Sequence, residues 1–439
     1  MTVTSQNFGE KNNAGDEGIP SPASIGFSST QVKRYRYGTH RSISPDETLE
    51  RIMPHLKKFG ITRVANITGL DSIGLPVFSV YRPNSRSLAV SQGKGLDLSA
   101  ARVSGLMEAI EFYHAERVKL PLRWACFTEL QQEASVLDVS RLPRMTTSRF
   151  HPFRPILWCE GRDLIGGEQV WVPYESVHTD FSLPLPGGSG NFQMSSNGLA
   201  SGNHWLEAVG HGICEVVERD ALALWSIDGA SANPAGRLDL STVDDPACRQ
   251  AINLFRAAGQ AIGVWSITTD IGLPAFACVI ADREPNHLDQ FYSSDGSGCH
   301  ATREIALLRA LTEAAQTRLT YIAGARDDVH RDFFKSARDP ARVALMLARI
   351  ERDEIAPALS FQAIPTMDQD SFDDDIAHQL ARLRAVGIEQ VVAVDLGGYV
   401  PGIEVARVII PGLEGLHDAP GYCPGPRARI RARRECDHQ

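Results

Sequence analysis

Two glutamates three residues apart, Glu215 and Glu218, stand in the middle of an apolar stretch. On a helix, residues at this spacing share one face with Cβ atoms about 5–6 Å apart, so both carboxylates would point at one spot. Glutamate is rarely fully buried unless it is paired, and Val216 and Val217 between the two are apolar. A shared cation would resolve this conflict, and carboxylate oxygens are ligands that suit Mg²⁺.

The same spacing occurs twice more, in Glu108 and Glu111 and, with an amide in the second place, in Glu313 and Gln316. Each copy has an alanine seven residues before its first glutamate and a polar residue four before it, namely Ser104, His211 or Arg309. For a single helix, glutamates on a solvated face would be the simpler interpretation. Three copies favour a metal site. His211 could act as a base, although a histidine so placed is more often structural.

Glycines precede each of these segments, at residues 93–95, 198–202 and 296–298. Glycine lets the backbone approach a ligand closely, so phosphate is a candidate ligand, although none of the three fits the strict phosphate-loop patterns. Lys94 could contact phosphate as a point charge or could simply be solvated. We expect a repeated unit of strand, glycine loop and acid-bearing helix.

Other elements are marked by capping and by β-branched runs. Ser44, Pro45 and Glu47 form a capping box that should open a helix ending by Gly60. The remaining strand candidates are residues 156–159, 169–172, 390–395 and 405–410. A second short repeat, Ile-Gly-Leu-Pro at 73–76 and 271–274, precedes two further strand-like stretches.

Composition is that of an ordinary globular protein: 439 residues, 43% hydrophobic and 22% charged. The net charge of −9 argues against a nucleic-acid or anionic-membrane surface. No apolar run is long enough for a membrane span and no secretory signal opens the chain, so we expect a cytoplasmic enzyme. The eight cysteines form no Cys-x-x-Cys pair, which indicates neither a zinc site nor a disulfide scaffold.

Three regions are expected along the chain. Residues 1–30 are rich in Ser, Gly and Asn and should be a disordered tail. Residues 31–412 should form one catalytic domain. Residues 413–439, with scattered prolines and arginines, should be an irregular tail whose charge is solvated.

With these motifs together, the chain resembles the YcaO superfamily, whose members use Mg-ATP to activate peptide backbone amides. The resemblance runs from about residue 33 to about 412 and lies in four ordered motifs: Ser104-x-x-x-Glu108-x-x-Glu111, Asn197-Gly-Leu-Ala-Ser-Gly-Asn203, Glu215-Val-Val-Glu218-Arg219 and Glu313-x-x-Gln316-x-Arg318. It implies an α/β fold of repeated units around a mixed sheet, with ATP and magnesium ions between acid-bearing helices.

Site residues follow from the resemblance position by position. The metal ligands would be Glu108, Glu111, Glu215 and Glu218. The nucleotide contacts would be Ser104, Asn197, Arg219, Gln316, Lys94 and Arg318, and the basic residues Lys33, Arg36 and Arg41 should lie near ATP. The catalytic residue remains unassigned.

The implied chemistry answers the difficulty of an amide. Attack on its carbonyl gives an oxyanion whose oxygen leaves poorly, and phosphoryl transfer from ATP makes that oxygen a good leaving group. A neighbouring Cys, Ser or Thr as nucleophile gives an azoline; sulfide gives a thioamide.

The C-terminal end decides between the products. Azoline-forming members commonly end in alternating prolines, and this chain ends in an arginine-rich stretch instead. With the segments 324–328 and 408–414, this resembles members that work beside a TfuA protein in thioamide formation. A peptide or protein substrate, a TfuA-like partner and a sulfur donor are thus expected. An azoline-forming cyclodehydratase and a non-catalytic nucleotide-binding accessory protein stay open, as does the oligomeric state, a homodimer included.

Overall fold

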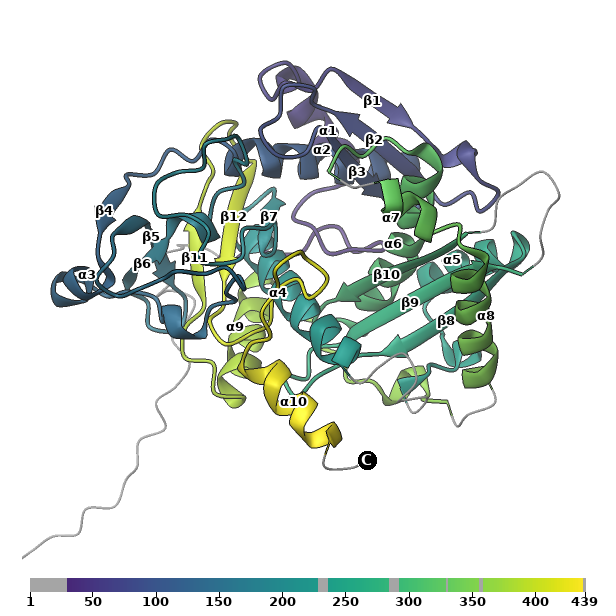
Figure 1. Cartoon of the computed structure of the whole chain (residues 1–439). Coiled ribbons are helices and arrows are strands. Elements are labelled where there is room, and N and C mark those ends of the chain that lie inside the picture. The colour runs from purple at the N-terminus through teal and green to yellow at the C-terminus, as the bar shows by residue number, and fades with distance from the viewer. Residues whose placement is uncertain (1–29, 228–235, 284–291, 329–330, 355–357, 437–439) are drawn as a thin grey trace, which may run out of the picture.

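The computed structural model describes residues 30–227, 236–283, 292–328, 331–354 and 358–436 (Figure 1). Its strands form three sheets rather than the single mixed sheet expected, and all pairs between named strands are antiparallel. The first has the order β1 (Arg63–Asn66), β2 (Val77–Tyr81), β3 (Val90–Lys94), and the second the order β10 (Ser293–Cys299), β9 (Ala275–Asp282), β8 (Gln260–Ser266). The third has the order β4 (Arg123–Ala125), β5 (Ile156–Asp163), β11 (Val392–Asp395), β12 (Glu404–Ile409), β7 (Leu199–Gly202), with β6 (Gln169–Pro173) beside β5.

Three long helices each follow a strand and carry the acidic motifs. They are α2 (Leu98–Ala115) after β3, α4 (Trp205–Ile227) after β7 and α6 (Arg303–Ala323) after β10. The α/β fold with its repeated strand and acid-bearing helix is therefore confirmed. The other α-helices are α1 (Pro45–Ile52), α3 (Phe127–Glu133), α5 (Pro246–Ala257), α7 (Arg331–Ser336), α8 (Pro340–Glu354), α9 (Phe372–Ala385) and α10 (Pro426–Cys436).

The glycines before the acidic helices mainly lie in strands, not in the loops that we expected. Gly93 belongs to β3, and Gly296 and Gly298 belong to β10. A Cβ on Gly93 would lie 1.9 Å from the Gly105 nitrogen, and one on Gly298 would lie 2.2 Å from the Ala306 oxygen. These glycines therefore let a strand and the following helix approach each other, and they form no phosphate loop.

Several local predictions are confirmed. Helix α1 opens with both hydrogen bonds of the Ser44 and Glu47 capping box and has proline in its first turn. The expected strand pair 156–159 and 169–172 is the hairpin β5 and β6. In both Ile-Gly-Leu-Pro copies the glycine, Gly74 or Gly272, has a positive φ near 75–79° that other residues rarely adopt, so the repeat marks a tight turn before β2 and β9.

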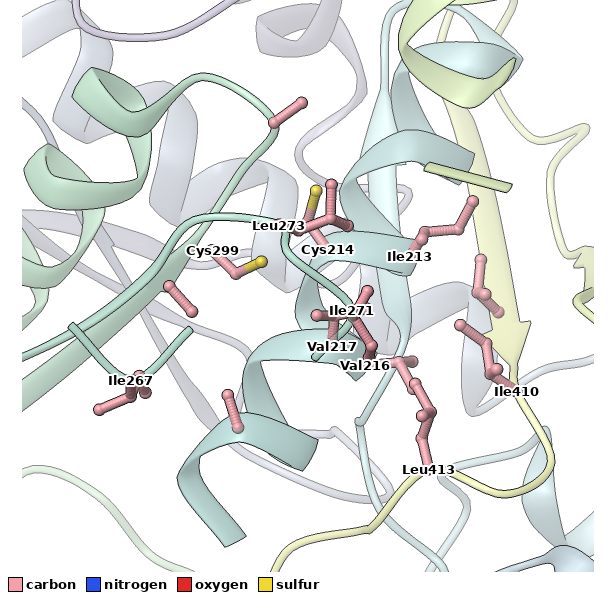
Figure 2. Close-up of a cluster of buried hydrophobic side chains, with 14 of the residues drawn as sticks. Ile213, Cys214, Val216, Val217, Ile267, Ile271, Leu273, Cys299, Ile410 and Leu413 are labelled. Atoms are coloured by element: carbon pink, nitrogen blue, oxygen red, sulfur yellow. The ribbon is translucent and has the colours of Figure 1, made fainter. Parts of the chain in front are cut away.

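One face of α4 is packed into a hydrophobic cluster, part of which Figure 2 shows. Ile213, Val216 and Val217 on this helix lie beside Ile410 and Leu413, which follow β12, and beside the turn before β9. Because this face is held by packing, the opposite stripe of α4 is fixed in direction. No helix among the described residues is long and apolar enough to span a bilayer.

The C-terminal segment differs from the irregular tail that we expected. Residues 426–436 form α10, whose first amides are capped by the buried Glu414: its carboxylate accepts from the Gly425 and Ala428 nitrogens at 2.7 and 2.8 Å. Arg427 pairs with the buried Asp220 of α4 at 3.0 Å. The C-terminal segment is thus docked on α4 through interactions that no local sequence pattern predicts. The expected disordered tail, residues 1–30, falls almost wholly outside the described residues.

Candidate functional site

A cavity of about 470 Å³ lies where α2, α4 and α6 meet. Each helix contributes side chains spaced four and then three or four residues apart, which is one stripe of a helix surface. The stripes are Ser104, Glu108 and Glu111 on α2, Glu207, His211, Glu215 and Glu218 on α4, and Arg309, Glu313 and Gln316 on α6. The repetition in the sequence therefore corresponds to three walls of one site.

The four glutamates expected as metal ligands all line this cavity. Three of them are oriented by strands. Glu111 accepts from the Ser201 hydroxyl of β7 at 2.6 Å, and Glu218 accepts from the Ser297 hydroxyl and Cys299 nitrogen of β10 at 2.6 and 3.0 Å. Glu108 accepts from the Gln92 nitrogen of β3 at 3.3 Å. Each of these contacts comes from a strand that ends just before one of the three helices.

Burial raises the pKa of three of these carboxyls, to about 7 for Glu108 and Glu215 and about 8 for Glu111. Their mutual repulsion adds to this effect, while Arg219, Arg326 and Lys94 oppose it. A divalent cation among them would favour the ionised forms. The donor set, carboxylate oxygens at a water-accessible cavity, fits Mg²⁺.

Glu313 behaves differently from the other acids. Burial would raise the pKa of its carboxyl, but Lys94, Arg219 and Arg309 lower it to about 2. The Lys94 ammonium lies 2.6 Å from the Glu313 carboxylate. Glu313 is therefore ionised at neutral pH, and its charge is shared with the cations of the cavity.

Two arginines of the cavity have donor nitrogens that no described residue satisfies. The Nε atoms of Arg219 and Arg309 are buried and have no hydrogen-bond partner in the described part of the chain. A buried charged donor without a partner is costly, so an anion at this position would be favourable. Phosphate oxygens match guanidinium donors in geometry and charge. Acids for magnesium and arginines for phosphate thus meet in one cavity, which fits a magnesium–nucleotide complex.

Of the residues expected to contact the nucleotide, some line the cavity and others lie elsewhere. Lys94, Ser104, Arg219 and Gln316 line the cavity, and the Gln316 amide also donates to the Gln92 carbonyl at 3.1 Å.

Two expected contacts lie elsewhere. Asn197 lines a separate cavity of about 50 Å³ together with Arg407, which belongs to β12. Arg318, two residues after Gln316, points off the stripe and is buried against Asp71 and Asp282, at 3.5 and 3.0 Å. An arginine there offsets the charge of Asp282 at the end of β9 and of Asp71 in the loop before β2. A linear motif does not reveal on which side of its helix each member lies.

The basic N-terminal residues also separate. Arg41 lines the cavity and pairs with Glu207 at 3.1 Å. Lys33 is buried and lies 2.7 Å from the Asp375 carboxylate, and Arg36 pairs with acids before α9. His40, His300 and Asp375 offer three ligand atoms within 4.8 Å of one another. Because Lys33 already neutralises Asp375, we interpret this cluster as a buried ion pair.

Sequence reasoning did not assign several residues of the cavity. Glu313 and Arg309 line the cavity and belong to the third copy of the repeated pattern. Their positions in that copy could have identified them as site residues. Glu207 lies one turn before His211 on the stripe of α4. Arg326, on the loop after α6, belongs to the segment 324–328 noted for its resemblance, but no local pattern places it beside Glu108 in the cavity. No cysteine is among the described residues that line the cavity.

Comparisons with solved structures support the fold. A heterocyclase in complex with substrate and cofactor superposes with a TM-score of 0.71 at 22% identity, and the match covers 88% of this chain and 54% of that one. The chain thus spans about half the length of that protein. YcaO from Methanopyrus kandleri, bound with AMPPCP and Mg²⁺, gives a TM-score of 0.69 at 24% identity over 90% of this chain and 98% of that one.

Sequence comparisons give closer relatives. An uncharacterised protein in the tfuA 3′ region of Rhizobium leguminosarum bv. trifolii is 39% identical, over 85% of this chain and 88% of that protein. A protein of Methanothermobacter thermautotrophicus is 36% identical, over 85% of this chain and 95% of its own. The family model for the YcaO cyclodehydratases, described as binding ATP and Mg²⁺, matches residues 92–414. The chain therefore belongs to the YcaO family of ATP- and Mg²⁺-binding proteins.

Proposed function

We propose that this protein uses Mg-ATP to activate a backbone amide of a peptide or protein substrate, and that the product is a thioamide. The observation that carries the first part is the cavity itself. Four glutamates from two helices and two arginines with unpaired buried Nε donors face one space. Such a site can hold a magnesium–phosphate complex and stabilise charge on a transferring phosphoryl group.

Roles in this proposal follow from the contacts. Glu108, Glu111, Glu215 and Glu218 would hold magnesium, and Arg219 and Arg309 would bind phosphate oxygens. Ser104, Lys94 and Gln316 would complete the nucleotide site. Bound Mg-ATP supplies the phosphoryl group that turns the amide oxygen into a leaving group. Asn197 and Arg318 are not assigned to the nucleotide, since they lie outside the cavity.

The thioamide product rests on the relative in the tfuA 3′ region. The described residues that line the cavity include no cysteine, so sulfur would come from a separate donor, and a TfuA-like protein is the proposed partner. The structural likeness to a heterocyclase supports an alternative product, an azoline formed on Cys, Ser or Thr of a precursor peptide.

The first test is calorimetric titration of ATP with and without Mg²⁺, for the wild type and for Glu108→Gln and Glu215→Gln. We expect binding that needs Mg²⁺ and weakens about tenfold or more in both variants, equivalent to about 1.4 kcal/mol. The matched control is Glu47→Gln in the capping box of α1, outside the cavity. Equal affinity in the wild type and both cavity variants would contradict the proposal.

The second test is mass spectrometry of a candidate peptide after incubation with Mg-ATP, sulfide and a TfuA-like protein. Exchange of oxygen for sulfur increases the mass and supports thioamidation. Loss of water would instead indicate the azoline-forming reaction. ATP binding without any consumption of ATP in the complete mixture would indicate an accessory protein.

A further inference from the structure

Two polar residues of the cavity contact each other directly. His211 of α4 and Arg309 of α6 meet at the wall, with Arg309 Nη1 2.9 Å from His211 Nε2. A guanidinium stays protonated and has only donors. Arg309 therefore donates and His211 Nε2 accepts, which requires a neutral His211 that carries its proton on Nδ1. Burial and the charges of Arg309 and Arg41 lower the pKa of His211 well below its usual value, in agreement with this state.

The contact also fixes Arg309. One edge of its guanidinium is held by His211, while Nε remains buried without a partner. Arg309 lies one turn before Glu313 on the stripe of α6 that faces the cavity. An unanchored arginine would lose rotamer freedom when it bound an anion, and an anchored one has lost it already. His211 thus prepares Arg309 for a ligand in the cavity.

We propose that His211 is a positioning residue, which orients the Arg309 guanidinium toward the phosphates of the nucleotide, and is not the base of the reaction. Its Nε2 lone pair is occupied by Arg309 and its Nδ1 carries a proton, so no proton-accepting atom remains. This inference rests on the proposed Mg-ATP function, and it names a contact within that site which the sequence motifs do not include.

Three variants test the proposal by titration with Mg-ATP. His211→Phe fills the space but accepts no hydrogen bond, and we expect about 10- to 100-fold weaker binding, the range for a hydrogen bond to a charged group. His211→Gln offers an acceptor oxygen at a similar reach, and we expect affinity within about threefold of the wild type. In an Arg309→Gln background, His211→Phe should have no further effect, because the group that it orients is gone.

The matched control is His178→Phe. His178 is buried, stacks on Tyr174 and lies outside the cavity, so this change reports general damage from losing a buried histidine. We expect unchanged Mg-ATP affinity. Wild-type affinity in His211→Phe would overturn the inference. So would an equal loss in the Arg309→Gln background, because an effect independent of Arg309 is merely structural.

A second measurement does not depend on ATP binding. In protein labelled with ¹⁵N-histidine, His211 Nε2 should be unprotonated at neutral pH, and its resonance should shift in Arg309→Gln. A protonated Nε2 would overturn the inference. If the wild type bound no Mg-ATP, the proposed function would fail, and the nitrogen spectrum would still decide whether His211 holds Arg309.

Discussion

A bound cation would change the protonation state of three carboxyl groups in the cavity. Glu108, Glu111 and Glu215 have pKa values raised by burial to between about 7 and 8. Near neutral pH a large fraction of them is therefore protonated in the metal-free protein. If these carboxylates bind Mg²⁺ as proposed, binding requires the ionised form and would release those protons, so metal affinity and pH would be linked.

We predict that the metal-free protein loses stability as pH rises from about 6 to 8.5. The folded pKa of each of the three groups lies above its unfolded value, so their stabilisation is complete below the unfolded pKa and is lost as pH passes through about 7 to 8. Mg²⁺ should offset this loss and therefore raise the melting temperature more at pH 8.5 than at pH 6. Thermal unfolding with and without Mg²⁺ at both pH values measures the effect.

Glu111→Gln provides the control for that prediction. It removes the group with the highest of the three pKa values, so the metal-free variant should lose less stability between pH 6 and 8.5. A rise in melting temperature with Mg²⁺ that is equal at both pH values in the wild type would contradict the linkage.

At the scale of elements, the site depends on how closely each helix approaches the strand before it. Gly93 of β3 faces Gly105 and Ala101 of α2, and a Cβ there would lie 1.9 Å from the Gly105 nitrogen. The backbone, not a movable side chain, fills the space. Glycines of β10 allow the same close approach of strand and helix where β10 meets α6.

Gly93→Ala should therefore push α2 away from β3. We expect a loss of about 3 kcal/mol or more in the free energy of unfolding, since backbone atoms must shift. Chemical denaturation measures it. The control is Gly69→Ala: this glycine has open space where a Cβ would point and no positive φ, so its effect should be within about 0.5 kcal/mol. Equal stability of the two variants would rule out the close approach.

The C-terminal helix is attached to α4 next to the acidic motif. Arg427 Nε donates to the buried Asp220 carboxylate at 3.0 and 3.1 Å, and Asp220 follows Arg219 directly. We predict that Arg427→Ala costs about 3 kcal/mol, because it leaves a buried acid with fewer partners.

Hydrogen exchange of the amides at the end of α4 and chemical denaturation would detect this loss. The neighbouring Arg429 is exposed, and Arg429→Ala should change stability by less than about 0.5 kcal/mol. The idea that α10 supports α4 is untenable if both variants unfold like the wild type.

At the scale of the whole molecule, distant parts of the chain close the cavity. The segment 35–41 forms part of its wall and is held by Lys33, which lies beside Asp375 at the start of α9. Lys33 and Asp375 are 342 residues apart in the sequence and are both buried. This ion pair thus connects the wall of the cavity to α9, in the C-terminal part of the chain.

We predict that Lys33→Ala costs about 3–5 kcal/mol and weakens Mg-ATP binding, because it leaves the Asp375 charge buried without a partner and loosens the wall. The double variant Lys33→Met with Asp375→Leu replaces both charges by apolar groups and should recover most of the stability. Thermal unfolding and ATP titration measure the two effects. A double variant as unstable as the single one would show that the pair does more than neutralise charge.

Local sequence patterns were enough to predict the repeated helices and the acidic residues on them. Helical spacing is local, so Glu108, Glu111, Glu215, Glu218, Arg219 and Gln316 could be placed on common stripes before any tertiary contact was known. The strand hairpins and the capping box are equally local. The family resemblance came from the same ordered motifs, and the comparisons confirmed it.

Which motif members reach the cavity, and what the glycines do, depends on contacts between segments that are distant in the sequence. Arg318 and Asn197 belong to the motifs, yet Arg318 pairs with Asp71 and Asp282 and Asn197 lines a separate cavity. The glycines were expected in loops that could approach a ligand, because a sequence does not show what faces a missing Cβ. His211 of α4 and Arg309 of α6 are in contact although they are 98 residues apart in the sequence. The docking of α10 likewise depends on Asp220 of α4. Contacts between distant segments arise from tertiary packing, which the local spacing of residues along the chain does not predict.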